Sequence, residues 1–85
     1  MLFRSALKIE PHFEAYSIRG DAYFQKQDYD RAIANYIKAK RLDTQVARAY
    51  LQRAKQRAAD GHADAAARDR EQAYDIEPSL QPASN

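Results

Sequence analysis

Apolar residues recur at spacings of three and four along most of the chain, and this is the pattern of amphipathic helices. Gly and Pro, which interrupt helices, are few, and all except Gly20 stand at or beyond the ends of the apolar segments. Asp28 can cap the second segment, Gly61 can end the third in the left-handed conformation, and Pro78 stops the fourth. The pattern predicts four helices, over about residues 11–26, 29–42, 46–59 and 63–76.

The apolar stripe of the second predicted helix includes Ile33, Tyr36 and Ile37 and continues to Leu42. Before the first helix, residues 2–9 fit two turns of a further helix. At the other end, residues 81–85 are expected to form a flexible tail.

The strongest signal in the sequence is an internal repeat. Shifting the segment 13–46 by a constant 34 residues places it on 47–80 and matches small, aromatic and charged residues. The matched pairs are Ala15 with Ala49, Tyr16 with Tyr50, Arg19 with Arg53, Asp30 with Asp64, Ala32 with Ala66, and Ala39 with Ala73. Two helical hairpins in tandem at this period are typical of a repeat protein.

The two units resemble the tetratricopeptide repeat (TPR) family. The matching positions are small, aromatic or proline residues: Tyr16, Gly20, Tyr23, Ala32, Tyr36 and Ala39 in the first unit, and Tyr50, Ala54, Ala66, Ala73 and Pro78 in the second. The resemblance implies an all-α fold, built as a right-handed stack of antiparallel helix hairpins. It also implies a single domain over residues 1–80, with the end of a preceding repeat at 1–11 and full repeats at 13–46 and 47–80.

Several of these residues have expected structural roles. Small residues allow paired helices to approach closely, and aromatic residues fill the space between hairpins. The small residues are Gly20, Ala32, Ala54 and Ala66, and the aromatic ones include Tyr16 and Tyr50.

Arg53 and Asp69 are expected to form an ion pair inside the second hairpin. Arg53 falls on the inner side of its helix, and Asp69 lies at the same level on the facing helix. A half-buried arginine is normally paired, so a structural role is favoured over a binding role. The corresponding contact in the first hairpin would join Arg19 and Asn35.

The family resemblance implies that a partner peptide or helix binds in a concave groove lined by the first helix of each hairpin. The positions on those helices that face away from the hairpin partner are Glu14, Ser17, Asp21, Phe24, Gln25, Arg48, Leu51, Gln52 and Lys55. One half of this groove is acidic and the other basic, and Phe24 and Leu51 would be apolar anchors.

Two other interpretations of the groove charges remain open. Glu14 could pair with Arg48 and Asp21 with Lys55 across adjacent repeats, as exposed salt bridges that are compatible with peptide binding. Some members of the family instead bind the C-terminal carboxylate of chaperones with a lysine, asparagine and arginine clamp. Ser17 and Asp21 replace two of those residues, and Asp21 would repel a carboxylate, so this use is disfavoured.

Composition narrows the function classes further. Fourteen Lys and Arg against twelve Asp and Glu leave a net charge of +2, so no nucleic-acid partner is expected. Without Cys, and with only the separated His12 and His62, the chain predicts no metal site, and His62 is expected to cap a helix. No serine is accompanied by a recognisable His and acid, so we expect neither catalysis nor a cofactor.

No apolar run approaches the length of a membrane span, so a soluble, cytoplasmic protein without a membrane partner is expected. Self-association is the alternative function, because a stack of repeats exposes apolar surface at uncapped ends. At the N-terminal end, Leu2, Phe3 and Leu7 would lack a partner helix, and a homo-oligomer could bury them.

Overall fold

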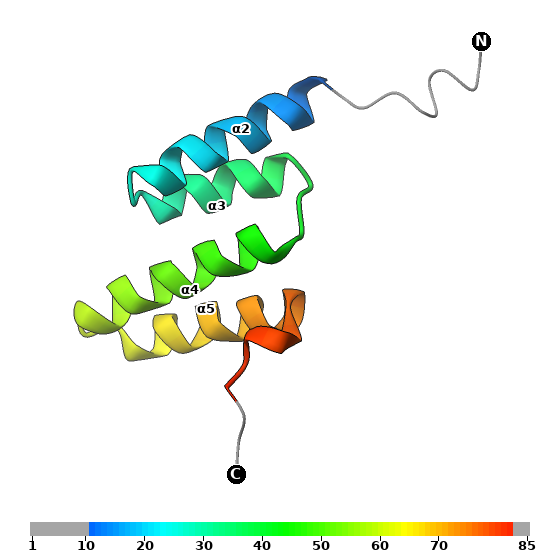
Figure 1. Ribbon diagram of the computed structural model, residues 1–85. Coiled ribbons are helices and arrows are strands. Elements are labelled where there is room, and N and C mark those ends of the chain that lie inside the picture. The colour runs from blue at the N-terminus through cyan, green and yellow to red at the C-terminus, as the bar shows by residue number, and fades with distance from the viewer. Residues whose placement is uncertain (1–10, 83–85) are drawn as a thin grey trace.

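The computed structural model of the protein describes residues 11–82 (Figure 1). Its elements are α2 (Pro11–Gln25), α3 (Tyr29–Lys38), α4 (Thr44–Ala59), α5 (Ala63–Ile76) and the short 3-10 helix η1 (Pro78–Leu80). No strand occurs within these residues, and the predicted all-α hairpin stack is confirmed.

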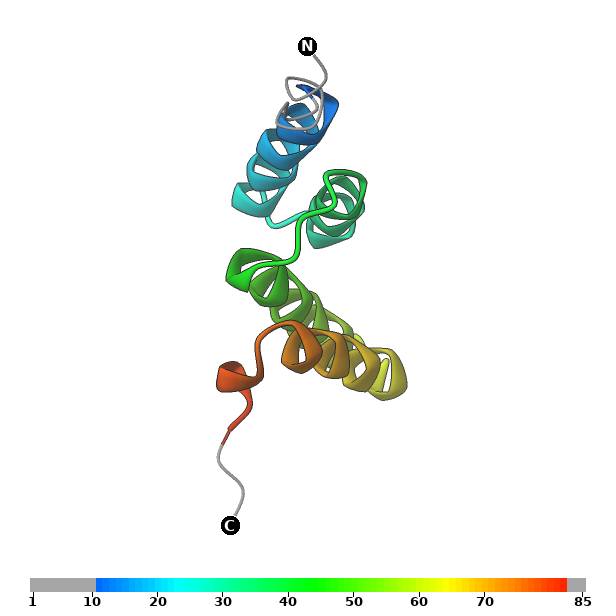
Figure 2. The same cartoon turned by 90° about the vertical axis from the view of Figure 1, so that its right-hand side faces the viewer.

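The helices are stacked in chain order, so that α2 and α3 form one antiparallel hairpin and α4 and α5 form the next (Figure 1). Helix α3 packs against both α2 and α4, and it therefore holds the two hairpins together. The view turned by 90° shows the two helix pairs as separate layers joined by the segment between α3 and α4 (Figure 2).

The turns after α2, α3 and α4 share one hydrogen-bond arrangement, the Schellman motif. After α3, the N–H of Lys40 donates to the carbonyl of Ile37 at 2.9 Å and the N–H of Arg41 to that of Tyr36 at 3.0 Å. The motif needs a residue with positive φ, which is Gln27 (64°), Lys40 (55°) or Gly61 (86°) in the three turns. Gly61 ends α4 in the way the sequence predicts.

The Schellman turn also corrects the expected length of the second helix. α3 ends at Lys38, and the chain leaves the helix axis before Leu42. Ile37 is 58% and Leu42 is 77% exposed, so neither belongs to the buried stripe predicted for this helix. Asp28 and Asp43 accept hydrogen bonds from the N–H groups of Arg31 and Val46, and so cap α3 and α4.

The core lies around α3, where both hairpins meet. Its buried residues are Ala32, Ile33, Tyr36, Val46 and Ala49, with Tyr23, Phe24, Tyr50 and Ile76 packed against them. The small residues expected between paired helices, Gly20, Ala32, Ala54 and Ala66, are all buried.

Gly20 shows why small residues are needed at this helix contact. A Cβ atom at this position would lie 2.5 Å from two ring atoms of Tyr36 and 3.1 Å from the carbonyl oxygen of Ala32. Helices α2 and α3 therefore approach too closely here for any larger residue.

Several predictions lie outside the described residues. These include the additional helix over 2–9, the apolar residues Leu2, Phe3 and Leu7, and the last part of the tail, 83–85. The repeat boundaries at 13–46 and 47–80 stay predictions.

Candidate binding surface

On α2, two of the predicted groove residues are engaged by the segment that joins the hairpins. Arg41 Nη1 donates to Ser17 Oγ at 2.9 Å and to Asp21 Oδ1 at 3.1 Å, and its Nε donates to Asp43 Oδ2 at 2.8 Å. The Tyr36 hydroxyl also donates to Asp21 Oδ1, at 2.5 Å. Arg41 thus connects α2 to the start of α4.

These contacts decide the charge of the α2 half of the surface. Burial alone would lower the pKa of Arg41, but the hydrogen bond and charge of Asp43, with the charge of Asp21, raise it above its ordinary value. Arg41 is therefore a fixed cation that Asp21 and Asp43 share. The pairing of Asp21 with Lys55 is wrong, because the partner of Asp21 is Arg41.

The ionisation of the Tyr36 phenol allows its contact with Asp21 to be tested by varying the pH. Burial, together with the hydrogen bond to Asp21, raises the pKa of Tyr36 from 10.0 to about 12. The folded protein holds this proton more tightly than the unfolded chain, so its stabilising effect is present below pH 10 and lost as pH rises through 12.

We expect the free energy of unfolding to fall between pH 10 and pH 12, and to fall less in Tyr36→Phe, which has no phenol to ionise. Urea unfolding at several pH values in this interval measures the difference. An equal fall in both proteins would contradict the assigned pKa.

On α4, the basic residues of the predicted groove are free of such contacts. Arg48 and Lys55 are both exposed, and neither forms a salt bridge within residues 11–82. They are seven residues apart and therefore lie on the same side of α4. Between them, Leu51 and Gln52 are half-buried.

The remaining α2 positions are of two kinds. Glu14 and Gln25 are exposed, and the predicted pair of Glu14 with Arg48 is absent from the described residues. Phe24 is half-buried, with its ring edge-on to Tyr29 at a centroid distance of 5.2 Å, and it packs against the core. Phe24 is thus a fixed part of the hairpin and not a free anchor.

An open hollow of about 290 Å³ lies where α3 ends, lined by Ile37, Lys40, Arg41 and Leu42. The exposed side chains of Ile37 and Leu42 supply its apolar surface. Because Arg41 also contacts Ser17 and Asp21, the hollow adjoins the α2 half of the predicted groove.

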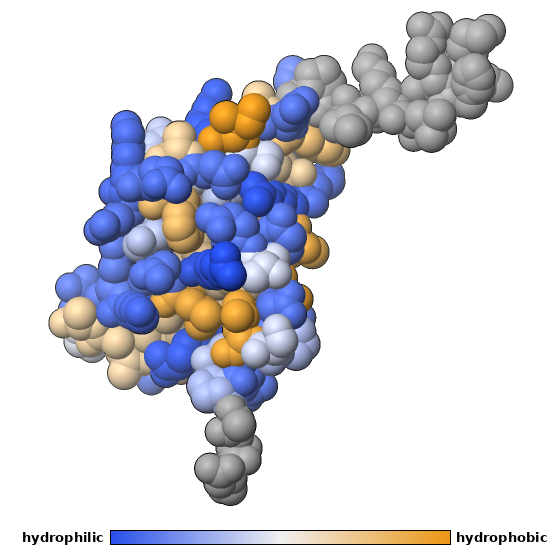
Figure 3. All heavy atoms as spheres, in the orientation of Figure 1, coloured by the Kyte–Doolittle hydropathy of each residue, from blue (hydrophilic) through white to orange (hydrophobic). Residues whose placement is uncertain are grey.

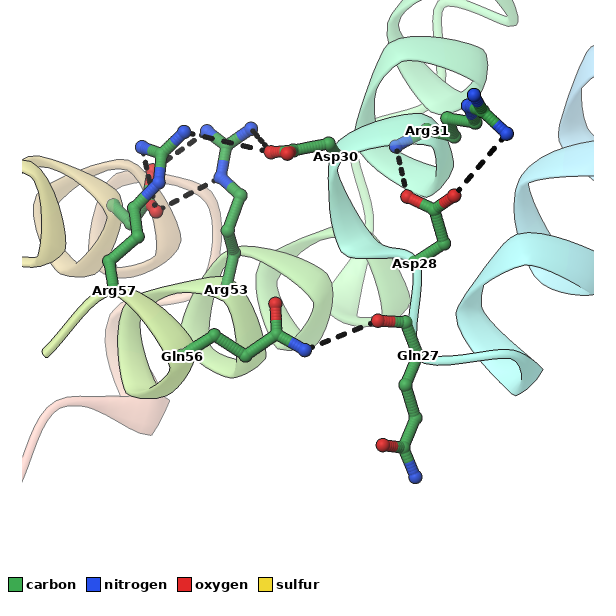
Figure 4. Close-up of polar contacts among 8 residues, drawn as sticks. Gln27, Asp28, Asp30, Arg31, Arg53, Gln56 and Arg57 are labelled. Carbon is green, nitrogen blue, oxygen red and sulfur yellow. Dashed lines mark hydrogen bonds and ion pairs between the residues drawn. The ribbon is translucent and has the colours of Figure 1, made fainter. Parts of the chain in front are cut away.

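A second cluster of charges joins the hairpins on the side of α4 that faces α3 (Figure 4). Arg53 donates from Nε to Asp69 Oδ2 at 3.0 Å and from Nη2 to Asp69 Oδ1 at 2.8 Å, so the predicted pair is present and bidentate. Its remaining nitrogen, Nη1, donates to Asp30 Oδ1 of α3 at 3.0 Å. Arg57 contacts the same two carboxylates, at 3.3 Å and 3.6 Å.

The Asp69 carboxylate lies inside the second hairpin, with its side chain 4% exposed, whereas the Asp30 side chain is 74% exposed. The hydrogen bonds to Asp69 raise the pKa of Arg53 above its ordinary value, against the effect of burial. Beside this cluster, the Gln56 side chain donates to the carbonyl of Gln27 at 3.2 Å (Figure 4).

The first hairpin has no equivalent cluster within the described residues, and the predicted contact between Arg19 and Asn35 is wrong. The Asn35 side chain donates to the carbonyl of Arg31, one turn earlier in α3, at 2.8 Å. Arg19 is exposed and lies over the ring of Tyr16, at 5.6 Å from its centroid. An asparagine in place of aspartate removes the charge that would draw the guanidinium inward.

Arg41 and Asp30 make contacts that the sequence pattern did not identify. Arg41 belongs to a basic run that is typical of a solvated helix face, and only its position after a positive-φ turn directs it to α2. Asp30 stands out in the sequence only as one member of a repeated pair with Asp64, which marks an acidic position present in both units.

Residues 11–82 contain no group of His, Asp and Glu that could hold a metal ion. His62 stands at the N-cap position of α5, but its side chain makes no capping hydrogen bond, so the predicted capping role is wrong. No helix in this part of the chain is both long enough and apolar enough to cross a membrane. Polar side chains cover much of the face seen in Figure 3.

Residues 20–61 match the family model of the TPR repeat. The matched segment runs from Gly20 in α2 to Gly61 after α4, and therefore contains the whole junction between the hairpins. No curated protein and no solved structure matches the chain.

Proposed function

Since the chain belongs to the TPR repeat family, we propose that it is a non-catalytic module that binds a segment of a partner protein across α2 and α4. The surface proposed for this contact consists of the groove positions of the two helices, from Glu14 to Gln25 and from Arg48 to Lys55.

The charges of this surface carry the proposal. Asp21 is paired with Arg41, which it shares with Asp43, whereas Arg48 and Lys55 have no carboxylate partner within residues 11–82. The surface therefore presents two free cations on one side of α4, against one free carboxylate on α2, Glu14, which forms no salt bridge within the described residues. A partner segment with acidic side chains complements it, and such charges govern orientation and the rate of encounter.

The hollow beside Arg41 extends this surface with apolar contacts. Ile37 and Leu42 are exposed there, and Lys40 adds a further cation at its edge. An apolar side chain next to a carboxylate matches these three residues. We therefore propose that the partner segment combines acidic with large apolar residues.

Reversing the two free cations, with Arg48→Glu and Lys55→Glu together, should weaken binding by about tenfold or more, or about 1.4 kcal/mol. The probe is a peptide selected by the wild-type protein from a random displayed library, labelled and titrated by fluorescence anisotropy. Both residues are exposed, so circular dichroism should show unchanged helicity.

The control is Arg68→Glu with Arg70→Glu, which changes the net charge equally on exposed positions of α5. Its binding should stay close to that of the wild type. A peptide that binds all three proteins alike, or a control that loses affinity as strongly as the test variant, would overturn the proposed surface.

A further inference from the structure

The 34-residue offset relates α2 to α4 and α3 to α5, so each end of the stack can be compared with the junction between α3 and α4. At that junction α4 contributes Val46 and Ala49, which are 1% and 0% exposed. The equivalent residues of α2, His12 and Ala15, are exposed. Helix α2 thus exposes the face that, on α4, packs against α3. Within the described residues no helix packs on this face of α2.

The outer face of α2 carries a small apolar residue and a cation. Ala15, the equivalent of the buried Ala49, is exposed there. Arg19 lies 5.6 Å from the centroid of Tyr16, and its equivalent Arg53 lies 5.6 Å from that of Tyr50. Arg53 forms a salt bridge with Asp30 of α3, whereas Arg19 forms no salt bridge within residues 11–82.

The outer face of α5 presents the complementary group. Asp64, in the first turn of α5, is the equivalent of Asp30 in the first turn of α3. It is exposed and has no cation partner in the described part of the chain. Ala67 occupies the place of Ile33 and is exposed, whereas Ile33 is 3% exposed in the junction.

We propose that copies of this chain stack head to tail, with α5 of one copy on the outer face of α2 of the next and Asp64 paired with Arg19. The contact repeats the junction between α3 and α4: Ala15 of α2 takes the place of Ala49, and Ala67 of α5 takes the place of Ile33. Helix η1 follows the C-terminal end of α5, so the first turns, with Asp64 and Ala67, are free to make the contact (Figure 1).

This contact joins two different faces, so it cannot close as a dimer and instead continues the stack from copy to copy. It goes beyond the proposed function because it uses the ends of the stack and not the groove. It also differs from self-association through Leu2, Phe3 and Leu7, which lie outside the described residues.

Sedimentation equilibrium of the wild-type chain, from about 10 μM to about 1 mM, should give an average mass that rises with concentration beyond two chains. A monomer throughout, as would result if residues 1–10 covered α2, overturns the proposal. A plateau at two chains overturns it too, because it indicates a closed dimer.

Two single variants identify the faces. Ala15→Arg blocks α2 and Ala67→Arg blocks α5, and each variant alone should remain monomeric. In an equal mixture, the unchanged α5 face of one variant can bind the unchanged α2 face of the other, so the average mass should reach two chains and stop. If the wild type assembles but the mixture stays monomeric, the assignment of faces is wrong.

The control is Ala34→Arg, an exposed position of α3 whose equivalent in α5 is already Arg68. It should assemble as the wild type does. Loss of assembly in this control, with helicity retained, would show that added positive charge alone prevents the contact and would overturn the assignment.

Discussion

Replacing Asp69 by alanine should lower the free energy of unfolding by about 3–5 kcal/mol, because it leaves two arginines without their buried carboxylate. Asp69 accepts three hydrogen bonds, two from Arg53 and one from Arg57, and its side chain is 4% exposed. A small domain has a total stability of about 5–15 kcal/mol, so this loss brings the protein close to unfolding. Asp30, which is exposed, can replace only part of the lost interaction.

Thermal and urea unfolding monitored by circular dichroism measure this effect. Asp75→Ala is the matched control, since Asp75 is an exposed aspartate of the same helix, and its substitution should change stability by less than about 0.5 kcal/mol. Asp69→Asn should retain most of the loss, because it removes the charge and keeps the volume. Similar losses for Asp69→Ala and Asp75→Ala would refute a structural role for the buried pair.

Substituting Gly20 by alanine should destabilise the protein by about 1–3 kcal/mol, although alanine is the better helix former by about 1 kcal/mol. The added Cβ would lie 2.5 Å from ring atoms of Tyr36, and this ring cannot easily move. Tyr36 is fully buried, and its hydroxyl is hydrogen-bonded to Asp21. The backbone carbonyl of Ala32, at 3.1 Å, prevents a shift in the other direction.

Ala54→Gly provides the reciprocal control, because Ala54 is the equivalent of Gly20 in the second hairpin and is 2% exposed. There the residue equivalent to Tyr36 is the exposed Arg70, so alanine is accommodated, and glycine should cost about 1 kcal/mol. Urea unfolding of both variants compares the two positions. A gain in stability for Gly20→Ala would mean that α2 and α3 are not held in close contact.

The sequence was sufficient to predict the hairpins and the Arg53–Asp69 pair because both follow from helix periodicity and a fixed offset. Residues at known positions on two antiparallel helices have known neighbours, so a buried pair between them can be inferred from spacing alone. The capping by Asp28 and the turn at Gly61 are similarly local, since they depend on residues within one turn of the chain.

The parts that the sequence did not predict depend on the path of the chain between helices. Lys40 adopts positive φ, at 55°, although nothing in its residue type requires it, and this ends α3 before Leu42. The same turn brings Arg41 to Asp21 and leaves the side chain of Leu42 exposed. The missing Arg19–Asn35 contact had another cause, since the amide of Asn35 bonds to its own helix.

The division of Arg53 between two carboxylates gives its bonds different sensitivities to ionic strength. Its bonds to Asp69 lie within the second hairpin and away from solvent, so dissolved ions screen them little. Its bond to Asp30, one of the contacts between the hairpins, is open to solvent and is screened by salt. Added salt therefore weakens this contact between the hairpins before it weakens the pair inside the second hairpin, while the buried residues around α3 still hold the hairpins together.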